Sequence, residues 1–242
     1  MKKILRIALF ISAAVPVLAA AAALLFFTEK IKLNTPSQEE YPVRGVDVSS
    51  SQGEIDWGVL SEGLDFAYIK ATEGSRYTDD RFAYNYEQAR KTGLRVGAYH
   101  FFSFESSGAS QAENFISQVA GYEGMLPPVI DVELYGSFRD EPRPAEDIIP
   151  ELRDMVSAFE AHYGMKPVFY STGSAYRLYI RDYFPGCGLW IRDVFTRPSG
   201  DMQWDFWQYS GKGLLRGYNG EEKYIDLDVF RGTKEEFEVF CQ

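Results

Sequence analysis

Two carboxylic acids, Asp131 and Glu133, stand two positions apart in the apolar stretch PPVIDVELYG, residues 127–136. In a β-strand alternate side chains point to opposite faces, so both acids would share one face with their Cα atoms roughly 6.6 Å apart. Two acids this close to each other and to apolar neighbours are expected to titrate apart, one ionised and one keeping its proton near neutral pH. Such a pair suits general acid catalysis. The alternative is a strand end whose acids cap a helix or pair with arginines.

The elements that would position these acids alternate along the chain. Helical patterns are predicted over Asp79–Thr92, Ser110–Gly121 and Ala145–Tyr163, and glycines follow the first and the last of them as stop signals. Alternating strands and helices favour a parallel sheet, and eight strands in about 200 residues predict a single α/β domain, a compact and irregular TIM-like (β/α) barrel. The predicted strands are Val43–Val48, Phe66–Ala71, Arg95–Phe102, Pro128–Glu133, Pro167–Ser171, Leu189–Val194, Asp205–Tyr209 and Tyr224–Val229.

Three of the predicted strands end in acid. Asp47 ends the first strand, Asp131 and Glu133 end the fourth, and Asp226, followed by Asp228, lies in the last. The carboxyl ends of barrel strands form the ligand face, the first and last strands are neighbours, and the fourth lies across the mouth. We therefore expect the carboxylates to face one pocket. A glycosidic bond held there would be protonated from one side while negative charge stabilises an oxocarbenium-like centre from the other.

The composition bounds the remaining possibilities. The 242 residues are 45% hydrophobic and 16% aromatic, enough for the core of one large domain. A formal charge of −10, with no cluster of Lys and Arg outside the N-terminus, argues against a nucleic-acid partner. Aromatic side chains are abundant, and those outside the core could stack on sugar rings. Cys187 and Cys241 show no metal-binding spacing; they could form a disulfide, which the sequence does not decide.

The N-terminus carries a topological signal. Residues 7–27 are 21 positions without a charge, which as a helix would be roughly 31 Å long, about the thickness of a bilayer core. The apolar stretch is longer than the roughly 7–15-residue apolar core of a signal peptide, so we expect an uncleaved membrane anchor; cleavage would make the protein secreted. Residues 1–6 would be a short cytoplasmic tail, 28–42 a linker, and 43–242 a catalytic domain outside the cytoplasm, in the periplasm or at the cell surface.

Eight short segments, in this order, resemble the signature segments of the glycoside hydrolase family 25 lysozymes, the Chalaropsis-type N-acetylmuramidases. The resemblance covers residues 43–232 and implies a flattened, irregular (β/α) barrel. It also implies cleavage of the β-1,4 bond between N-acetylmuramic acid and N-acetylglucosamine in peptidoglycan glycan strands, with neither metal nor cofactor. We expect a monomer. The segments are RGVDVSSSQGEIDW, YIKATEG, VGAYHFF, PPVIDVE, FYST, LWIRD, WQYSG and IDLDVFRG.

The resemblance also implies roles for the acids. Glu133 matches the general acid that protonates the leaving group. Asp131 matches the acid that stabilises the reacting centre, by itself or by orienting the 2-acetamido group of the substrate. Asp47 and Asp226 match the remaining carboxylates of the cleft, which organise water or hold the sugar. Asp228 departs from the family pattern, because Asn is common at that position.

Further residues of these segments are expected to contact the glycan. Each has an alternative: Lys70 and Glu73 as an ion pair that compensates buried charge, and the others as packing in the core. Two other functions also remain open for the same barrel, a non-hydrolytic glycan-binding module and a scaffold that localises wall enzymes. The predicted substrate-binding residues are Tyr99, Lys70, Glu73, Tyr170, Trp190, Trp207, Gln208 and Tyr209.

Overall fold

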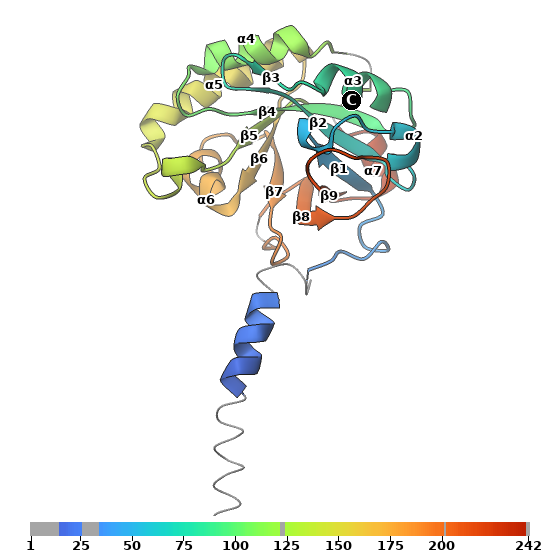
Figure 1. Cartoon of the computed structure of the whole chain (residues 1–242). Coiled ribbons are helices and arrows are strands. Elements are labelled where there is room, and N and C mark those ends of the chain that lie inside the picture. The colour runs from blue at the N-terminus through green and yellow to red at the C-terminus, as the bar shows by residue number, and fades with distance from the viewer. Residues whose placement is uncertain (1–14, 26–33, 122–123, 201, 241–242) are drawn as a thin grey trace, which may run out of the picture.

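The computed structural model describes residues 15–25, 34–121, 124–200 and 202–240, and its centre is a closed barrel of eight strands (Figure 1). The strand order is β1-β9-β8-β7-β6-β5-β4-β2, and β2 pairs with β1 to close the ring. The predicted barrel is thereby confirmed. The strands are β1 Arg44–Val48, β2 Phe66–Glu73, β4 Arg95–Phe101, β5 Val129–Val132, β6 Val168–Thr172, β7 Gly188–Arg192, β8 Phe206–Gly213 and β9 Ile225–Phe230.

The direction of β9 corrects the predicted all-parallel sheet. β9 runs antiparallel to both of its neighbours, β1 and β8. Parallel strands need a long crossover connection, usually a helix, whereas antiparallel strands do not. Residues 214–224, between β8 and β9, contain no helix, so the chain returns directly. A short strand, β3 (Tyr77–Thr78), adds a hairpin to the mouth end of β2.

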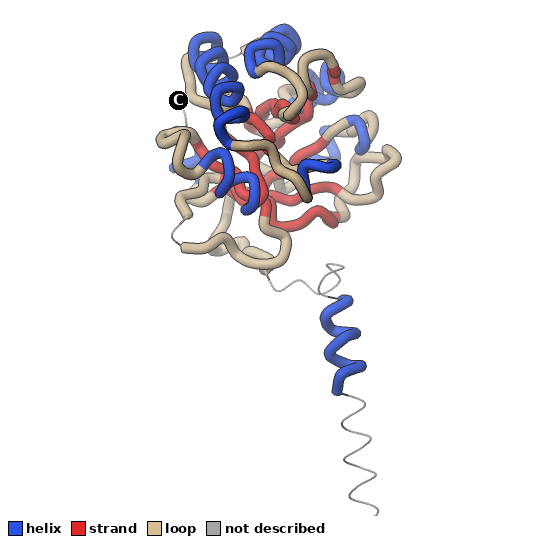
Figure 2. Tube along the Cα trace, turned by 90° about the vertical axis from the view of Figure 1, so that its left-hand side faces the viewer, coloured by secondary structure: helices blue, strands red, loops and turns tan. Residues whose placement is uncertain are grey.

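The helices lie mostly along one side of the barrel, and loops cover the opposite, lower side (Figure 2). Ala145–Tyr163 is helical as predicted and ends at Gly164, whose φ of 72° is left-handed. The second predicted helix starts earlier, at Gly108, because Ser107 accepts a hydrogen bond from the Ser110 amide. The helices are α2 Trp57–Leu60, α3 Phe82–Ala89, α4 Gly108–Gln118, α5 Ala145–Tyr163, α6 Gly173–Ala175, which continues into a π-helical turn at Tyr176–Ile180, and α7 Lys234–Glu238.

Alternate residues of the strands fill two different spaces. On β5, Val129 packs inside the barrel, whereas Ile130 and Val132 pack outward against the helices. The barrel interior is aromatic, and Phe237 of α7 packs into it at the end away from the mouth. On the outside of β7 and β8, where the figures show loops instead of helices, a third cluster forms around Trp207. Both faces of β8 are therefore buried.

The segment before β1 contributes to that third cluster. Asn34 Nδ2 donates to the backbone oxygen of Asp193 at 3.2 Å, and the Tyr41 ring packs edge-on against Trp207 with centroids 6.0 Å apart. The Arg197 guanidinium lies over the Tyr41 ring. Residues 34–41, the second part of the predicted linker, thus take the place of a covering helix on this side of the barrel.

The predicted anchor comprises residues 7–27, of which residues 7–14 and 26–27 lie outside the described residues. Its described part, residues 15–25, is helical. Among the stretches that the structure describes, no helix combines the length and the apolar character needed to cross a membrane. Cys187 is a half-buried free thiol, and its predicted partner Cys241 lies outside the described residues.

Candidate active site

The predicted acids meet in one cavity of about 310 Å³ at the mouth of the barrel. Asp47 comes from β1, Asp131 from β5, Glu133 directly follows β5, and Asp226 comes from β9. Asp226 lies near the beginning of β9, and the antiparallel direction of that strand pairs it with Asp47 at the mouth. The residues that line the cavity are Asp47, Ser49, Lys70, Tyr99, Phe101, Asp131, Glu133, Tyr170, Trp190, Arg192, Gln208 and Asp226.

Asp131 is a nearly buried acid, and one of its two carboxyl oxygens has no hydrogen-bond partner within the described part of the chain. Its exposed fraction is 7%, and the oxygen in question is Oδ1. Burial first, and then the charge of Glu133, raise the pKa of Asp131 well above its ordinary value, while Lys70 lowers it. An unpaired buried acceptor is costly, so this oxygen is prepared for a hydrogen-bond donor that a ligand brings.

Glu133 stands closer to the opening and is only half-buried. Burial raises the pKa of Glu133 above its ordinary value, and Arg192 and Tyr170 act in the opposite direction. The single hydroxyl proton of Tyr170 is donated to Gln208 Oε1 at 2.9 Å, so it is not available to Glu133 at the same time. A carboxyl group with a raised pKa beside a second acid is able to keep a proton and donate it.

Asp47 is held by a chain of hydrogen bonds across the barrel. Gln208 Nε2 donates to Asp47 Oδ2 at 2.7 Å, and Gln208 Oε1 in turn accepts from Tyr170. Burial raises the pKa of Asp47 to about 6, against the bond from Gln208. Asp47 therefore changes its charge close to the pH range in which Glu133 must keep its proton.

The floor of the cavity is aromatic. The Trp190 ring is 1% exposed and stacks on Tyr68, with centroids 4.9 Å apart and planes at 29°. Tyr170 meets Trp190 edge-on at 4.8 Å. These contacts fix the rings before any ligand binds, and Tyr99 and Tyr170 add hydroxyl groups to the cavity lining.

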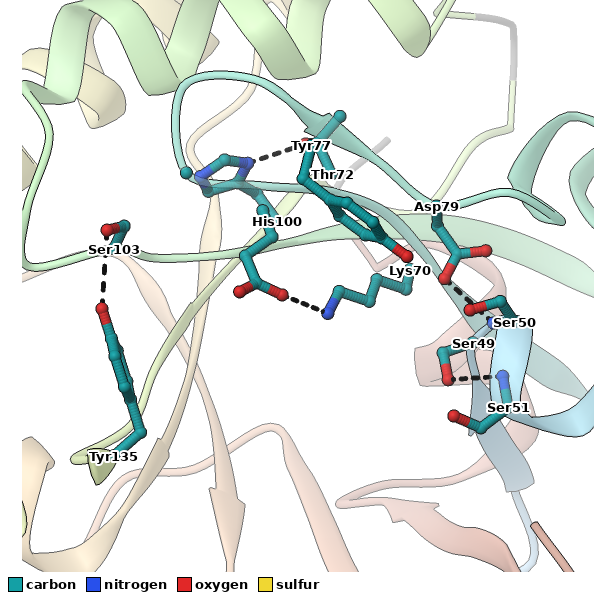
Figure 3. Close-up of polar contacts among 12 residues, drawn as sticks. Ser49, Ser50, Ser51, Lys70, Thr72, Tyr77, Asp79, His100, Ser103 and Tyr135 are labelled. Atoms are coloured by element: carbon teal, nitrogen blue, oxygen red, sulfur yellow. Dashed lines mark hydrogen bonds and ion pairs between the residues drawn. The ribbon is translucent and has the colours of Figure 1, made fainter. Parts of the chain in front are cut away.

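Lys70 and Glu73 form the ion pair that was one of their two predicted roles. The Lys70 Nζ to Glu73 Oε2 distance is 2.7 Å, and the ammonium also lies 5.1 Å from the centre of the Phe101 ring. Lys70 lies near Tyr77 at the mouth (Figure 3). Lys70 lines the cavity, whereas Glu73 does not, so Glu73 acts through Lys70.

Trp207 and Tyr209, predicted to contact sugar, are not brought to the cavity. Gln208 points into the barrel, and its two neighbours on β8 therefore point outward into the third cluster. Trp207 is 1% exposed and donates from Nε1 to the backbone oxygen of Asp193 at 2.8 Å. The structure corrects the prediction for both rings, which hold the segment before β1 and the loop after β7.

Two lining residues were not singled out from the sequence, Ser49 and Phe101. Ser49 follows Asp47 by two positions, and Phe101 follows Tyr99 by two. The alternation of side chains along a strand was therefore a signal that could have found both. Among the described residues, no group of His, Cys, Asp and Glu side chains is arranged to hold a metal ion.

His100 faces away from the cavity, opposite to Tyr99. Its Nδ1 lies 2.7 Å from Thr72 Oγ1, and its Nε2 lies 3.1 Å from Gln111 Oε1 (Figure 3 shows the Thr72 contact). Gln111 also accepts from the Ser103 amide. A neutral ring that donates from Nε2 and accepts at Nδ1 satisfies both neighbours, so His100 connects β2 and β4 to the loop at 102–107.

Acid is expected to destabilise the fold through His100. Burial lowers the pKa of His100 from 6.5 to about 4, so the neutral ring stabilises the fold fully above pH 6.5. That contribution, roughly 3 kcal/mol, is lost as the pH falls toward 4. Urea unfolding of the wild type and of His100→Gln at several pH values measures it. The difference between the two free energies of unfolding should shrink from pH 7 to pH 4, and a constant difference would contradict this assignment.

Comparison with known proteins agrees with this geometry. Residues 46–218 match the family described as Glycosyl hydrolases family 25. A solved family 25 glycosyl hydrolase from Bacillus anthracis is 51% identical, with a TM-score of 0.81 over 86% of this chain and 98% of that chain. The bacterial lysozyme from Streptomyces coelicolor is 32% identical, with a TM-score of 0.72 over 82% of this chain and 96% of that one.

A relative named as a lysozyme is also similar in sequence. Lysozyme M1 of Streptomyces globisporus is 36% identical over 217 residues, which are 79% of this chain and 68% of the relative. The family match covers most of the barrel, from β1 to the loop that precedes β9. The chain therefore belongs to glycosyl hydrolase family 25 and is a glycoside hydrolase.

Proposed function

We propose that this protein hydrolyses the β-1,4 bond between N-acetylmuramic acid and N-acetylglucosamine in peptidoglycan. The observation that carries the proposal is the placement of Asp131 and Glu133 side by side in one sugar-sized cavity, with Asp47 and Asp226 in the same cavity. The family membership and the relatives named as lysozymes support this choice of substrate.

Glu133 is the general acid of this mechanism. It protonates the oxygen of the leaving N-acetylglucosamine, which would otherwise depart as a poor, charged leaving group. Its partial burial supports this role by raising the pKa of Glu133, and its position nearer the opening lets a polymer reach it. Arg192 then stabilises the carboxylate that forms after proton transfer.

Asp131 stabilises the reacting centre by orienting the 2-acetamido group of the substrate. The amide N–H of that group is a donor, and Asp131 Oδ1 is a buried acceptor without a partner among the described residues. Holding the N–H turns the acetamido carbonyl oxygen toward the anomeric carbon, where positive charge develops. The hydrogen bond is strongest when Asp131 is ionised, a state that Lys70 favours.

Asp47 and Asp226 hold the sugar or the attacking water beside this centre, and aromatic side chains form the subsite walls. Tyr99 and Tyr170 offer hydroxyl groups, while Trp190 presents an apolar surface. Gln208 acts through Asp47, which it holds in place.

We also infer that residues 7–27 anchor the protein in a membrane, with residues 43–242 outside the cytoplasm as a monomeric catalytic domain. The 21 positions without a charge support this inference. Alkaline carbonate extraction of membranes from cells that produce the full chain tests it. Retention in the membrane pellet is expected, and release of the whole chain would contradict it.

The chemical test of the proposed function is the identity of the new reducing end. The full chain is incubated with purified peptidoglycan, the products are reduced with borohydride, and the reduced sugar is identified by mass spectrometry. Reduced N-acetylmuramic acid is expected. Reduced N-acetylglucosamine would instead indicate a glucosaminidase, and binding without any new reducing end would indicate a glycan-binding module.

A further inference from the structure

Asp228 is an acid that the proposed mechanism does not use. It lies on β9, two positions beyond Asp226 on the same face and therefore deeper in the barrel. Its exposed fraction is 1%. Trp190 Nε1 donates to Asp228 Oδ1 at 2.9 Å, and Asp228 Oδ2 has no hydrogen-bond donor among the described residues.

Asp47, on the neighbouring strand β1, is the acid whose charge acts most on Asp228. Gln208, which donates to Asp47, is paired with Asp228 across β8 and β9, so the three side chains lie on the same inner face of the barrel. Two ionised carboxylates cannot form a hydrogen bond, and in a buried site their charges repel each other. A proton on Asp228 removes the repulsion and gives the pair a donor. It also explains why Oδ2 finds no donor: in the neutral acid this oxygen carries the proton itself.

The charged and titratable groups around this pair favour the proton on Asp228. On β9 the closest is Asp226, a second acid that disfavours another charge. From β8, Gln208 donates to Asp47, and Tyr209 is a neutral phenol. From the other side Arg192 and Glu133 act on Asp47. Asp47 thus has a hydrogen-bond donor and a cation that stabilise its charge, whereas within the described part of the chain Asp228 has a single donor, Trp190, for one of its oxygens.

We propose that Asp228 is a positioning residue that keeps its proton in the resting enzyme and donates a hydrogen bond to the Asp47 carboxylate. With Gln208 it fixes Asp47 from two sides, below the cavity and out of reach of the substrate. A chain of side chains then runs from Tyr170 through Gln208, Asp47 and Asp228 to Trp190. The link to catalysis rests on the proposed role of Asp47; the protonation state does not.

The protonation state is tested without any turnover. The full chain is labelled with ¹³C at the aspartate side-chain carboxyl carbon, and the Asp228 signal is assigned by its absence from Asp228→Asn. At pH 7 the signal is expected at the chemical shift of a protonated carboxyl group. An Asp228 signal at the carboxylate position at pH 7 would overturn the proposal.

The hydrogen bond to Asp47 is tested by the pH titration of the Asp47 ¹³C carboxyl signal together with the acid limb of the kcat/KM profile, to which the ionisation of Asp47 contributes. Asp228→Asn keeps a neutral donor, whereas Asp228→Leu removes it, so Leu should raise the pKa of Asp47 and lower kcat/KM at pH 5 about tenfold relative to Asn. If Asp228 were ionised, both variants would remove a negative charge and move the acid limb to lower pH. That result would overturn the proposal, as would identical limbs for Asn and Leu. Should no turnover be found at all, the proposed function fails, while the ¹³C result still decides the protonation state.

Discussion

Replacing Glu133 by Gln is expected to lower kcat on peptidoglycan by on the order of 10³-fold. The amide has nearly the shape of the acid but no proton to donate, so the leaving oxygen departs unprotonated. The glycan contacts of the cavity remain, and KM should change little. Release of reducing ends from purified peptidoglycan, followed over time, measures the loss.

The matched control is Glu113→Gln, the same chemical change on an exposed position of α4. It should retain wild-type activity, and both variants should show the wild-type melting temperature. A Glu133→Gln enzyme that keeps more than about a tenth of the wild-type kcat would exclude Glu133 as the general acid.

Replacing Asp131 by Asn is expected to lower kcat by about 10²-fold to 10³-fold. Asn lacks the negative charge, and its amide group presents a donor or a weaker acceptor where the substrate N–H should bind. The interaction strengthens as charge develops at the reacting centre, so the loss should fall on kcat more than on KM. Initial rates over a range of peptidoglycan concentrations separate the two parameters.

A substrate that lacks the acetamido group provides the sharper contrast for Asp131. On a glycan whose acetamido groups have been removed by deacetylation, wild type and Asp131→Asn should be similarly slow, because the amine that remains has no carbonyl oxygen to turn toward the anomeric carbon. Asp154→Asn, an exposed acid on α5, is the control for the change of charge. If Asp131→Asn remained as far below the wild type on the deacetylated glycan as on the native one, Asp131 would act without the acetamido group.

Much of this site could be predicted because strand β5 is short and bounded by clear signals. The alternation in VIDVE places Asp131 and Glu133 on one face, and the structure finds both in the cavity. The ends of helix α5 were equally clear, because its apolar spacing runs without interruption to Gly164. Local patterns of this kind depend on neighbours in the sequence alone.

Strand β8 shows why other parts could not be predicted. Trp207 and Tyr209 are buried on the outer face by Tyr41 and Trp204, while Gln208 and Phe206 face inward. A strand that is buried on both faces has no amphipathic pattern. The sequence therefore does not show which of its two alternating sets of side chains faces the cavity. The cover comes from residues 34–41, whose docking depends on contacts far away in the sequence.

The direction of β9 has a partial signal. Residues 214–224 contain glycines and show no helical periodicity. A parallel connection would usually need a helix there. Because β9 is antiparallel, Asp226 lies at the mouth and Asp228 below it. In a parallel strand the order of depth would be reversed, and Asp228 would be the acid nearer the opening.

Dependence on the leaving group tests the central claim, that Glu133 donates a proton to the departing sugar, most directly. The substrate is a 2,4-dinitrophenyl β-glycoside of an N-acetylmuramic acid-containing saccharide, whose leaving group departs without protonation. Glu133→Gln should cleave it within about tenfold of the wild-type rate, while remaining about 10³-fold impaired on peptidoglycan. Equal impairment on both substrates would contradict the account, because Glu133 would then serve a step other than protonation of the leaving oxygen.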